Sequence, residues 1–167
     1  SRRYIEKSAR LLEIARFRHA FDDGSAESVL DALKWYQNED GGFGRALEPD
    51  LRENESSALC TTLAFQVLRS IQARPGDVCV SRGIAYLLAT LDKEKEHWRI
   101  IPRSAEESPH APWWNQKGRE CAFDSFSLNP TAEILGYLYD YQAKVPSEVL
   151  SVVSDRVATH LSGLETI

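Results

Sequence analysis

The sequence predicts an all-α protein built from repeated helical hairpins. Three observations lead to this prediction: apolar residues recur at helical spacing, no segment shows sustained strand alternation, and two pairs of segments resemble each other. LDALKWYQ at 30–37 resembles GIAYLLAT at 83–90, and CTTLAFQVLRS at 60–70 resembles TAEILGYLYDY at 131–141. We therefore expect one domain, residues 1–167, in which a helical hairpin is used twice.

The N-terminal half contains an opening helix and the first hairpin repeat. Apolar residues at helical spacing predict one helix over 1–22, and Gly24 ends it. The first repeat, 25–72, begins at Ser25, a residue type that is favoured at helix N-caps. Its second helix, near 56–71, carries small and apolar residues around most of its circumference, which is typical of a helix packed on several sides.

The C-terminal half contains a second repeat and the start of a third. The second repeat, 79–142, has a long insertion at 92–128 that is rich in Pro and Trp. Asn129-Pro130 then begins a helix, because proline is well tolerated in a first turn. A further helix, 147–164, is expected to be the first helix of a third repeat.

Composition excludes several classes of protein. At 167 residues and 43% hydrophobic content the chain can bury a continuous core, and its net charge of −5 offers no basic face for nucleic acid. No apolar run is long enough to span a membrane, so we expect a cytoplasmic protein. Cys60, Cys79 and Cys121 are widely spaced and form no CxxC pair, which predicts reduced, buried thiols and no metal site.

The segment QNEDGGFG resembles a known repeat. Gln37, Gly41, Gly42 and Phe43, at the end of a helix within a repeated hairpin, resemble the QW-type repeat of squalene-hopene cyclases and other class II terpene cyclases. The GGFG tetrad is equally similar to the repeat of protein prenyltransferase β-subunits. Both belong to the α/α-toroid superfamily, so the resemblance, over roughly residues 25 to 165, implies a partial toroid. In the second copy the glycines are missing and Trp98 stands in for the aromatic.

The same four residues have a structural interpretation that does not depend on the family. A glutamine near a helix end can bond to free backbone groups, and adjacent glycines let the chain reverse at positive φ. Phe43 can then pack over the helix end. We expect a strap between hairpins.

Glu48 and Asp50 are the candidate catalytic residues. Pro49 fixes the backbone between them, so both carboxylates should point in defined directions at a loop mouth. A carboxylic acid there could act as a general acid if burial raised its pKa, and Asp50 is the better candidate. The alternative is a solvated turn in which Asp50 or Asn54 caps the following helix.

The sequence departs from the enzyme patterns of the families that it resembles. It contains no DxDD motif of class II cyclases, and Asp22-Asp23 lacks the final acid of the DDxxD motif that holds magnesium in class I synthases. No cysteine has a histidine partner at zinc-ligand spacing. A diphosphate substrate would bring Mg²⁺ as a cofactor, but the sequence has no motif for it.

Aromatic residues in the insertion are the candidate ligand-binding residues. Trp98, Trp113 and Trp114 could wall an apolar cavity, with Asn129 at the end of the insertion as a polar contact. The alternative is an insertion that folds back and makes its own small core. His97 and His110 flank the cluster and are expected in solvated or hydrogen-bonded roles.

Two functions remain open at this stage. The first is a terpene cyclase-like or prenyltransferase-like protein that holds an apolar small molecule, such as an isoprenoid, in a toroid cavity. The second is a non-catalytic helical-repeat module that binds a protein or peptide on a concave face. An incomplete third repeat would leave an apolar surface, which predicts a homodimer or completion by the remainder of a longer chain.

Overall fold

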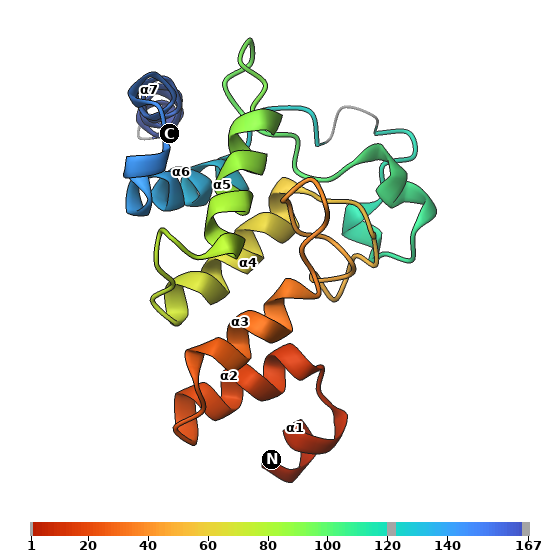
Figure 1. Ribbon diagram of the computed structural model, residues 1–167. Coiled ribbons are helices and arrows are strands. Elements are labelled where there is room, and N and C mark those ends of the chain that lie inside the picture. The colour runs from red at the N-terminus through yellow and green to blue at the C-terminus, as the bar shows by residue number, and fades with distance from the viewer. Residues whose placement is uncertain (1, 120–122, 165–167) are drawn as a thin grey trace.

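The computed structural model describes residues 2–119 and 123–164, where the regular secondary structure is helical and two long loops separate groups of helices (Figure 1). No β-strand is present among these residues, and the β-bridges between them are isolated. The all-α prediction is confirmed. The described α-helices are α1 (Arg2–Ser8), α2 (Leu11–Phe21), α3 (Ala26–Lys34), α4 (Ala58–Ser70), α5 (Val78–Thr90), α6 (Leu128–Asp140) and α7 (Ser147–Leu164). Short 3₁₀ helices lie at Arg103–Glu107, Pro112–Trp114 and Gln142–Lys144.

The helix predicted over 1–22 is two helices. Arg10 has extended backbone angles (φ −66°, ψ 157°) and precedes α2 as its N-cap residue. Its guanidinium donates to the carbonyl oxygens of Ala46 (2.8 Å) and Leu47 (3.1 Å) and also pairs with Glu13. These contacts hold Arg10 against the loop after α3, and they fall at the break between α1 and α2.

Side-chain caps define two helix starts. Ser25 Oγ accepts from the Ser28 N–H at 3.2 Å, as its position in the sequence predicts. For α4 the cap is Ser57, whose Oγ accepts from the Cys60 N–H at 3.0 Å. The expectation that Asp50 or Asn54 caps this helix is therefore wrong, because the chain makes further turns before α4 begins.

Along the chain, α2 packs with α3, α4 with α5 and α6 with α7, and the short helix α1 also contacts α2. The predicted repeats paired α3 with α4 and α5 with α6 instead. Connection length explains the difference, since short connections at 22–25, 71–77 and 141–146 join the packed pairs. Residues 35–57 (the first loop) and 91–127 (the second loop) separate the others.

Helix α4 lies at the centre of the main core. Phe65 and Leu68 are fully buried, and the Phe65 ring lies 5.3 Å from that of Tyr137 on α6. Each such side chain stabilises the fold by roughly 1.5–3 kcal/mol. Packing on several sides was predicted for this helix, and most of its residues are buried.

Polar contacts at the surface also join α4 to α6. The Arg69 guanidinium lies 4.6 Å from the centre of the Tyr137 ring and pairs with Asp140, and Gln66 Nε2 donates to Glu133 at 3.0 Å. Exposed pairs of this kind contribute at most about 1 kcal/mol each. Their main effect is on the orientation of α6 beside α4, because their contribution to the free energy of unfolding is small.

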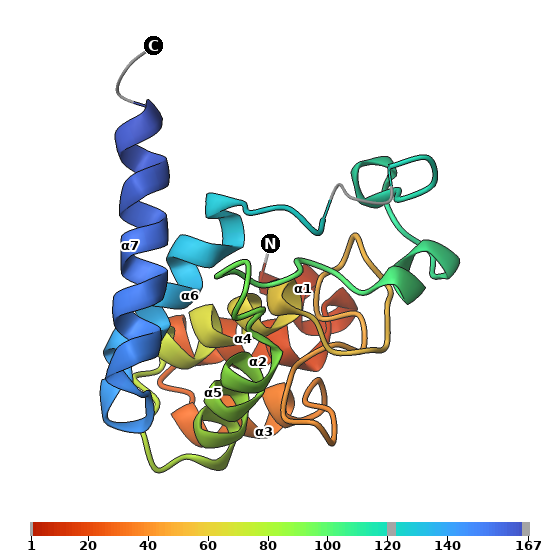
Figure 2. The same cartoon turned by 90° about the horizontal axis from the view of Figure 1, so that it is seen from above.

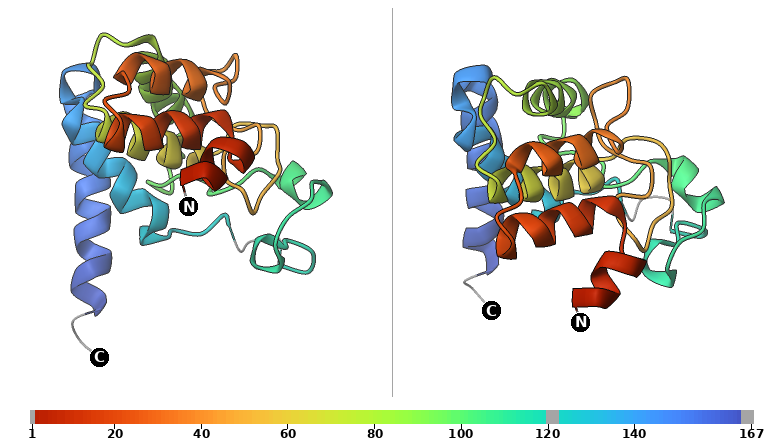
Figure 3. Two further views of the ribbon diagram at one scale, coloured as in Figure 1. Left: turned by 90° about the horizontal axis from the view of Figure 1, so that it is seen from below. Right: turned by 60° about the horizontal axis from the view of Figure 1, so that its bottom comes forward.

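Helix α7 runs along the edge of the molecule beside α6, and its C-terminal end extends past the other helices (Figures 2 and 3). Every residue from 158 to 164 is exposed. None of the helices in the described part of the chain is long and apolar enough to cross a membrane.

Candidate functional site

The predicted strap residues connect three helices. Gln37, three residues beyond the end of α3, donates from Nε2 to the carbonyl oxygens of Gly41 (2.8 Å) and Cys79 (3.1 Å). Cys79 lies in the first turn of α5, so one side chain joins the first loop to that helix. Phe43 is fully buried and its N–H donates to Thr61 Oγ1 on α4 at 3.1 Å.

Close approach of neighbouring atoms accounts for the two glycines. Gly41 has φ of +91°, and a Cβ added there would lie 2.6 Å from the Arg82 carbonyl oxygen. At Gly42 an added Cβ would meet Ser56 at 2.6 Å and the Tyr86 ring at 2.7 Å. Neither position has room for a side chain, and Gly41 also has a positive φ that favours glycine.

The predicted acids lie in an open turn. Asp50 is exposed, its N–H donates to Glu48 Oε1 at 3.2 Å, and its carbonyl oxygen accepts from the Ala111 N–H at 2.8 Å. Glu48 is half-buried. These contacts describe a hydrogen-bonded turn on which the second loop rests, the simpler of the two interpretations of this segment.

The second loop folds back on the first and makes its own small core. Leu51, Ile101, Ala105 and Phe123 are buried together, and the Trp114 ring lies 5.8 Å from that of Phe123. Backbone hydrogen bonds tie the two loops, including one from the Arg52 N–H to the Pro109 carbonyl oxygen at 2.9 Å.

The predicted ligand-binding residues lie in separate places. Trp98 belongs to the main core, is 1% exposed, and donates from its indole N–H to the Leu87 carbonyl oxygen at 2.7 Å. Trp114 packs on the small core, whereas Trp113 is 59% exposed and Asn129 is exposed. Trp98 is enclosed by protein and has no face open to a ligand, so the expectation of one shared aromatic wall is wrong.

The two histidines that flank the tryptophans in sequence, His97 and His110, differ in burial and in hydrogen bonding. His110 is half-buried, and its Nδ1 bonds the Ser108 carbonyl oxygen at 2.6 Å. His97 is 4% exposed, and its Nδ1 has no hydrogen-bond partner among the described residues. The expectation of a solvated or hydrogen-bonded role is therefore wrong for His97, which packs near Phe126 with ring centres 6.2 Å apart.

Glu53 is a buried carboxylate that sequence reasoning missed. It is 5% exposed, and its Oε1 accepts from the N–H groups of Asn54 (2.6 Å) and Glu55 (2.9 Å). Its Oε2 accepts from the Ser108 hydroxyl at 3.1 Å, across to the second loop. The surrounding sequence, RENE, is polar and gave no signal of burial.

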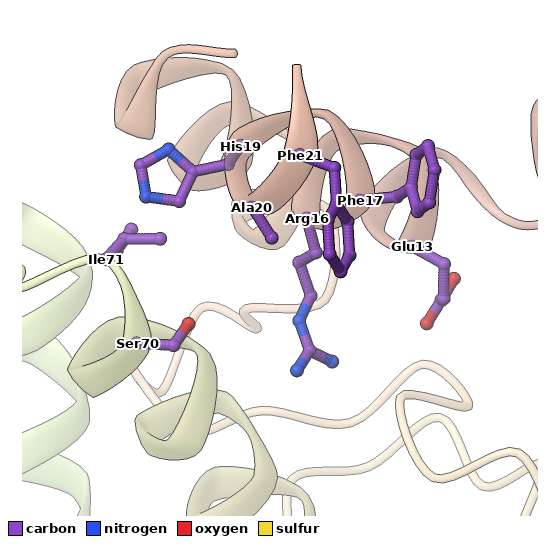
Figure 4. Close-up of a pocket in the computed structure, with 8 residues that line it drawn as sticks. All are labelled: Glu13, Arg16, Phe17, His19, Ala20, Phe21, Ser70 and Ile71. Atoms are coloured by element: carbon purple, nitrogen blue, oxygen red, sulfur yellow. The ribbon is translucent and has the colours of Figure 1, made fainter. Parts of the chain in front are cut away.

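A cavity of about 510 Å³ lies between α2 and the end of α4, and Figure 4 shows the residues around it. We call it the α2–α4 cavity. Its apolar lining comes from Phe17, Ala20 and Phe21 on α2 and from Ile71 after α4. The polar lining residues are Glu13, Arg16, His19 and Ser70. None of the predicted catalytic or ligand-binding residues lines it.

Helical spacing places most of this lining on one face of α2. Residues 13, 16, 17 and 20 recur at intervals of three and four, the spacing of one helix face. That spacing is visible in the sequence, but the cavity is not, because only the fold places this face of α2 opposite Ser70 and Ile71.

Among the described residues, no group of three or more His, Cys, Asp or Glu side chains is placed to hold a metal ion. Cys60 and Cys79 are buried free thiols, and burial raises the pKa of both. Cys121 lies outside the described residues. The two described thiols are therefore protonated, weakly reactive groups at neutral pH.

No protein-family model, curated protein sequence or solved structure matches this chain. The resemblance to toroid repeats therefore rests on the quoted residues of the first loop.

Proposed function

We propose that the chain is a segment of an α/α-toroid in which α2, α4 and α6 form the inner row of helices and α3, α5 and α7 the outer row. Three short-connected helix pairs support this arrangement, as does the direct packing of α4 on α6. The GGFG-type strap also lies where the chain passes from an outer helix, α3, to an inner one, α4.

In this proposal the protein holds an apolar small molecule of isoprenoid size in the α2–α4 cavity. The observation that carries it is an open cavity of about 510 Å³ whose apolar lining residues are two phenylalanines, an alanine and an isoleucine. Ligand pockets of roughly 300–1,000 Å³ with mostly apolar walls and a few polar groups are typical of small-molecule sites. The activity proposed is binding, because Glu48 and Asp50 lie elsewhere.

Binding can be followed directly at Ile71. Protein labelled at isoleucine δ1 methyl groups is titrated with farnesol, and we expect a saturable shift of the Ile71 resonance. Ala20→Arg should abolish the shift, because Ala20 is an exposed helix residue whose replacement fills the cavity. Ala85→Arg, at an exposed position on α5, is the control. A titration in which Ile71 does not respond in folded protein would overturn the proposal.

A second candidate, self-association, is favoured by the surface of the N-terminal helices. Tyr4 on α1 and Leu11 and Phe21 on α2 are large apolar side chains that are 73%, 78% and 74% exposed. A homodimer through α1 and α2 would cover them. Sedimentation over a wide concentration range should then show a dimer that Leu11→Glu dissociates, whereas a monomer at every concentration would rule this function out.

A further inference from the structure

The charges that line the α2–α4 cavity are not equally available to a ligand. Both carboxylate oxygens of Glu13 accept from Arg10, Oε1 at 2.6 Å and Oε2 at 3.0 Å. Arg10 is itself held by two backbone carbonyl oxygens, and its hydrogen bond with Glu13 is the main reason that its pKa is raised. This pair is a fixed, mutually neutralised unit at one end of the cavity.

Arg16 has no such partner. Within the part of the chain that the structure describes, its guanidinium makes no ion pair and no side-chain hydrogen bond. It extends away from α2 beside the ring of Phe21 (Figure 4). Arg16 is therefore the cavity's uncompensated charge, and it lies next to an apolar wall.

His19 adds a polar group to the same lining. Its Nδ1 lies 2.7 Å from the Gly24 carbonyl oxygen. A carbonyl oxygen can only accept, so Nδ1 carries the hydrogen and Nε2 of the neutral ring is an acceptor. The cavity thus offers one permanent positive charge in a planar fork.

We propose that the α2–α4 cavity selects an amphiphile with a single apolar tail and a carboxylate head. The tail lies against Phe17, Ala20 and Ile71, and the head pairs with the Arg16 guanidinium. A planar carboxylate matches the guanidinium fork in two parallel hydrogen bonds. One guanidinium suits a singly charged head better than a diphosphate, which carries several charges. This inference rests on the proposed function, since it specifies the ligand of the same cavity.

Three ligands with one tail test the head group: farnesoate, farnesol and farnesyl diphosphate, each below its aggregation concentration and followed at the Ile71 methyl group. At low salt we expect farnesoate to bind about fivefold more tightly than farnesol, the ratio typical of one well-placed surface ion pair. Raising the ionic strength should narrow that ratio, because the pair is exposed.

Matched variants distinguish the effect of the Arg16 charge on binding from an effect of the substitution on folding. Arg16→Gln should remove the preference for farnesoate and leave farnesol binding unchanged. Arg18→Gln removes the same charge from an exposed residue of α2 that does not line this cavity, and it should keep the preference. Arg16→Lys should retain only part of the preference for farnesoate, since a lysine ammonium cannot form the two parallel hydrogen bonds of a planar guanidinium.

The outcomes distinguish this inference from the proposed function. Equal binding of farnesoate and farnesol would overturn the carboxylate preference and leave the apolar site standing. Tighter binding of farnesyl diphosphate than of farnesoate would also overturn it. If no ligand shifts Ile71, the proposed function fails and the inference fails with it.

Discussion

The two long loops of this protein lead into similar helices but are held in place differently. The first loop, before α4, has a bridge between Gln37 and Phe43, and the second, before α6, has one between Asp92 and His97. Each bridge is at or next to a fully buried aromatic residue, Phe43 in one loop and Trp98 in the other. The shared feature is a buried aromatic anchor after a bridged turn.

The turns themselves differ in how closely they approach the helices. In the first loop, added Cβ atoms at Gly41, Gly42 and Gly44 would lie 2.2–2.6 Å from neighbouring atoms, so only glycine fits. In the second loop the Asp92 carboxylate accepts from the N–H groups of Glu94 (3.1 Å) and Lys95 (3.0 Å) and closes the turn without glycine.

This comparison shows which part of a repeat motif depends on its surroundings. The buried aromatic is needed in both loops because each must be fixed to the core. Glycine is needed only where the loop leaves no room for a Cβ, as at Gly44 against the Glu55 backbone and at Gly42 against the Tyr86 ring.

Removing the aromatic anchors should have the largest effect. Phe43→Ala and Trp98→Ala are each expected to lower the free energy of unfolding by about 4 kcal/mol, since both leave a cavity in a packed core. Urea denaturation measures the change. Trp113→Ala, at a side chain that is 59% exposed, should cost less than about 0.5 kcal/mol. If Trp98→Ala behaved like the Trp113 variant, the second loop would have no such anchor.

Adding a single methyl group should distinguish the turns. Gly44→Ala places a Cβ 2.2 Å from the Glu55 carbonyl oxygen and should destabilise the protein by about 2 kcal/mol through overpacking. Gly76→Ala is the control, because no heavy atom lies within 4 Å of the added Cβ. Equal melting temperatures for the two variants would show that the first loop is not tightly packed.

Lowering the pH should reduce the stability of the protein through protonation of His97 in the second loop. Burial lowers the pKa of His97, and the charges of Arg156 and Lys95 lower it further, whereas Asp92 acts in the opposite direction. The neutral ring therefore stabilises the fold above the unfolded pKa of about 6.5, and this contribution is lost as the pH falls through the lower folded value.

Unfolding free energies measured across this acid range test the effect. His97→Gln should show a flatter decline than the native protein, and His110→Gln, in the same loop, should follow the native curve. Parallel curves for native protein and His97→Gln would contradict the assignment.

The smallest effects are expected at the turn between the loops. Asp50→Asn and Glu48→Gln should each change stability by less than about 0.5 kcal/mol, because Asp50 is exposed and a glutamine can still accept the Asp50 N–H. Farnesol titrations of both variants should match those of the native protein. A loss of binding in either one would bring these carboxylates back into the candidate site.

Local sequence signals located most helices. Ser25 was recognised as a cap, and the apolar circumference of α4 correctly indicated a helix buried on several sides. Gln37 was expected to bond backbone groups near a helix end, and it contacts the carbonyl oxygens of Gly41 and Cys79. The cap, the helical periodicity and the Gln37 bond to Gly41 depend on nearby residues, so they can be deduced without a fold, whereas the bond to Cys79 joins residues 42 positions apart.

Features that depend on distant residues could not be deduced. Sequence similarity suggested which helices resemble one another, but the lengths of the connections determined which of them pack together. The tryptophans of the second loop looked like one aromatic cluster because they are close in sequence. The fold places Trp98 in the main core and Trp114 in a second, smaller one.

The sequence by itself determined an all-α chain, most of whose helices lie near their observed positions, and a glycine-rich strap after the helix that is α3 in the structure, but it predicted one helix where α1 and α2 lie. Only the tertiary structure decided the candidate site. Glu13 lies three residues from Arg10 on one side and three residues from Arg16 on the other, so sequence spacing alone does not determine its partner. Arg10 takes both oxygens of Glu13 and is itself held by the loop after α3. Arg16 is left without an acidic partner and faces the α2–α4 cavity, because the bond between Arg10 and the Ala46 carbonyl oxygen holds Arg10 beside Glu13.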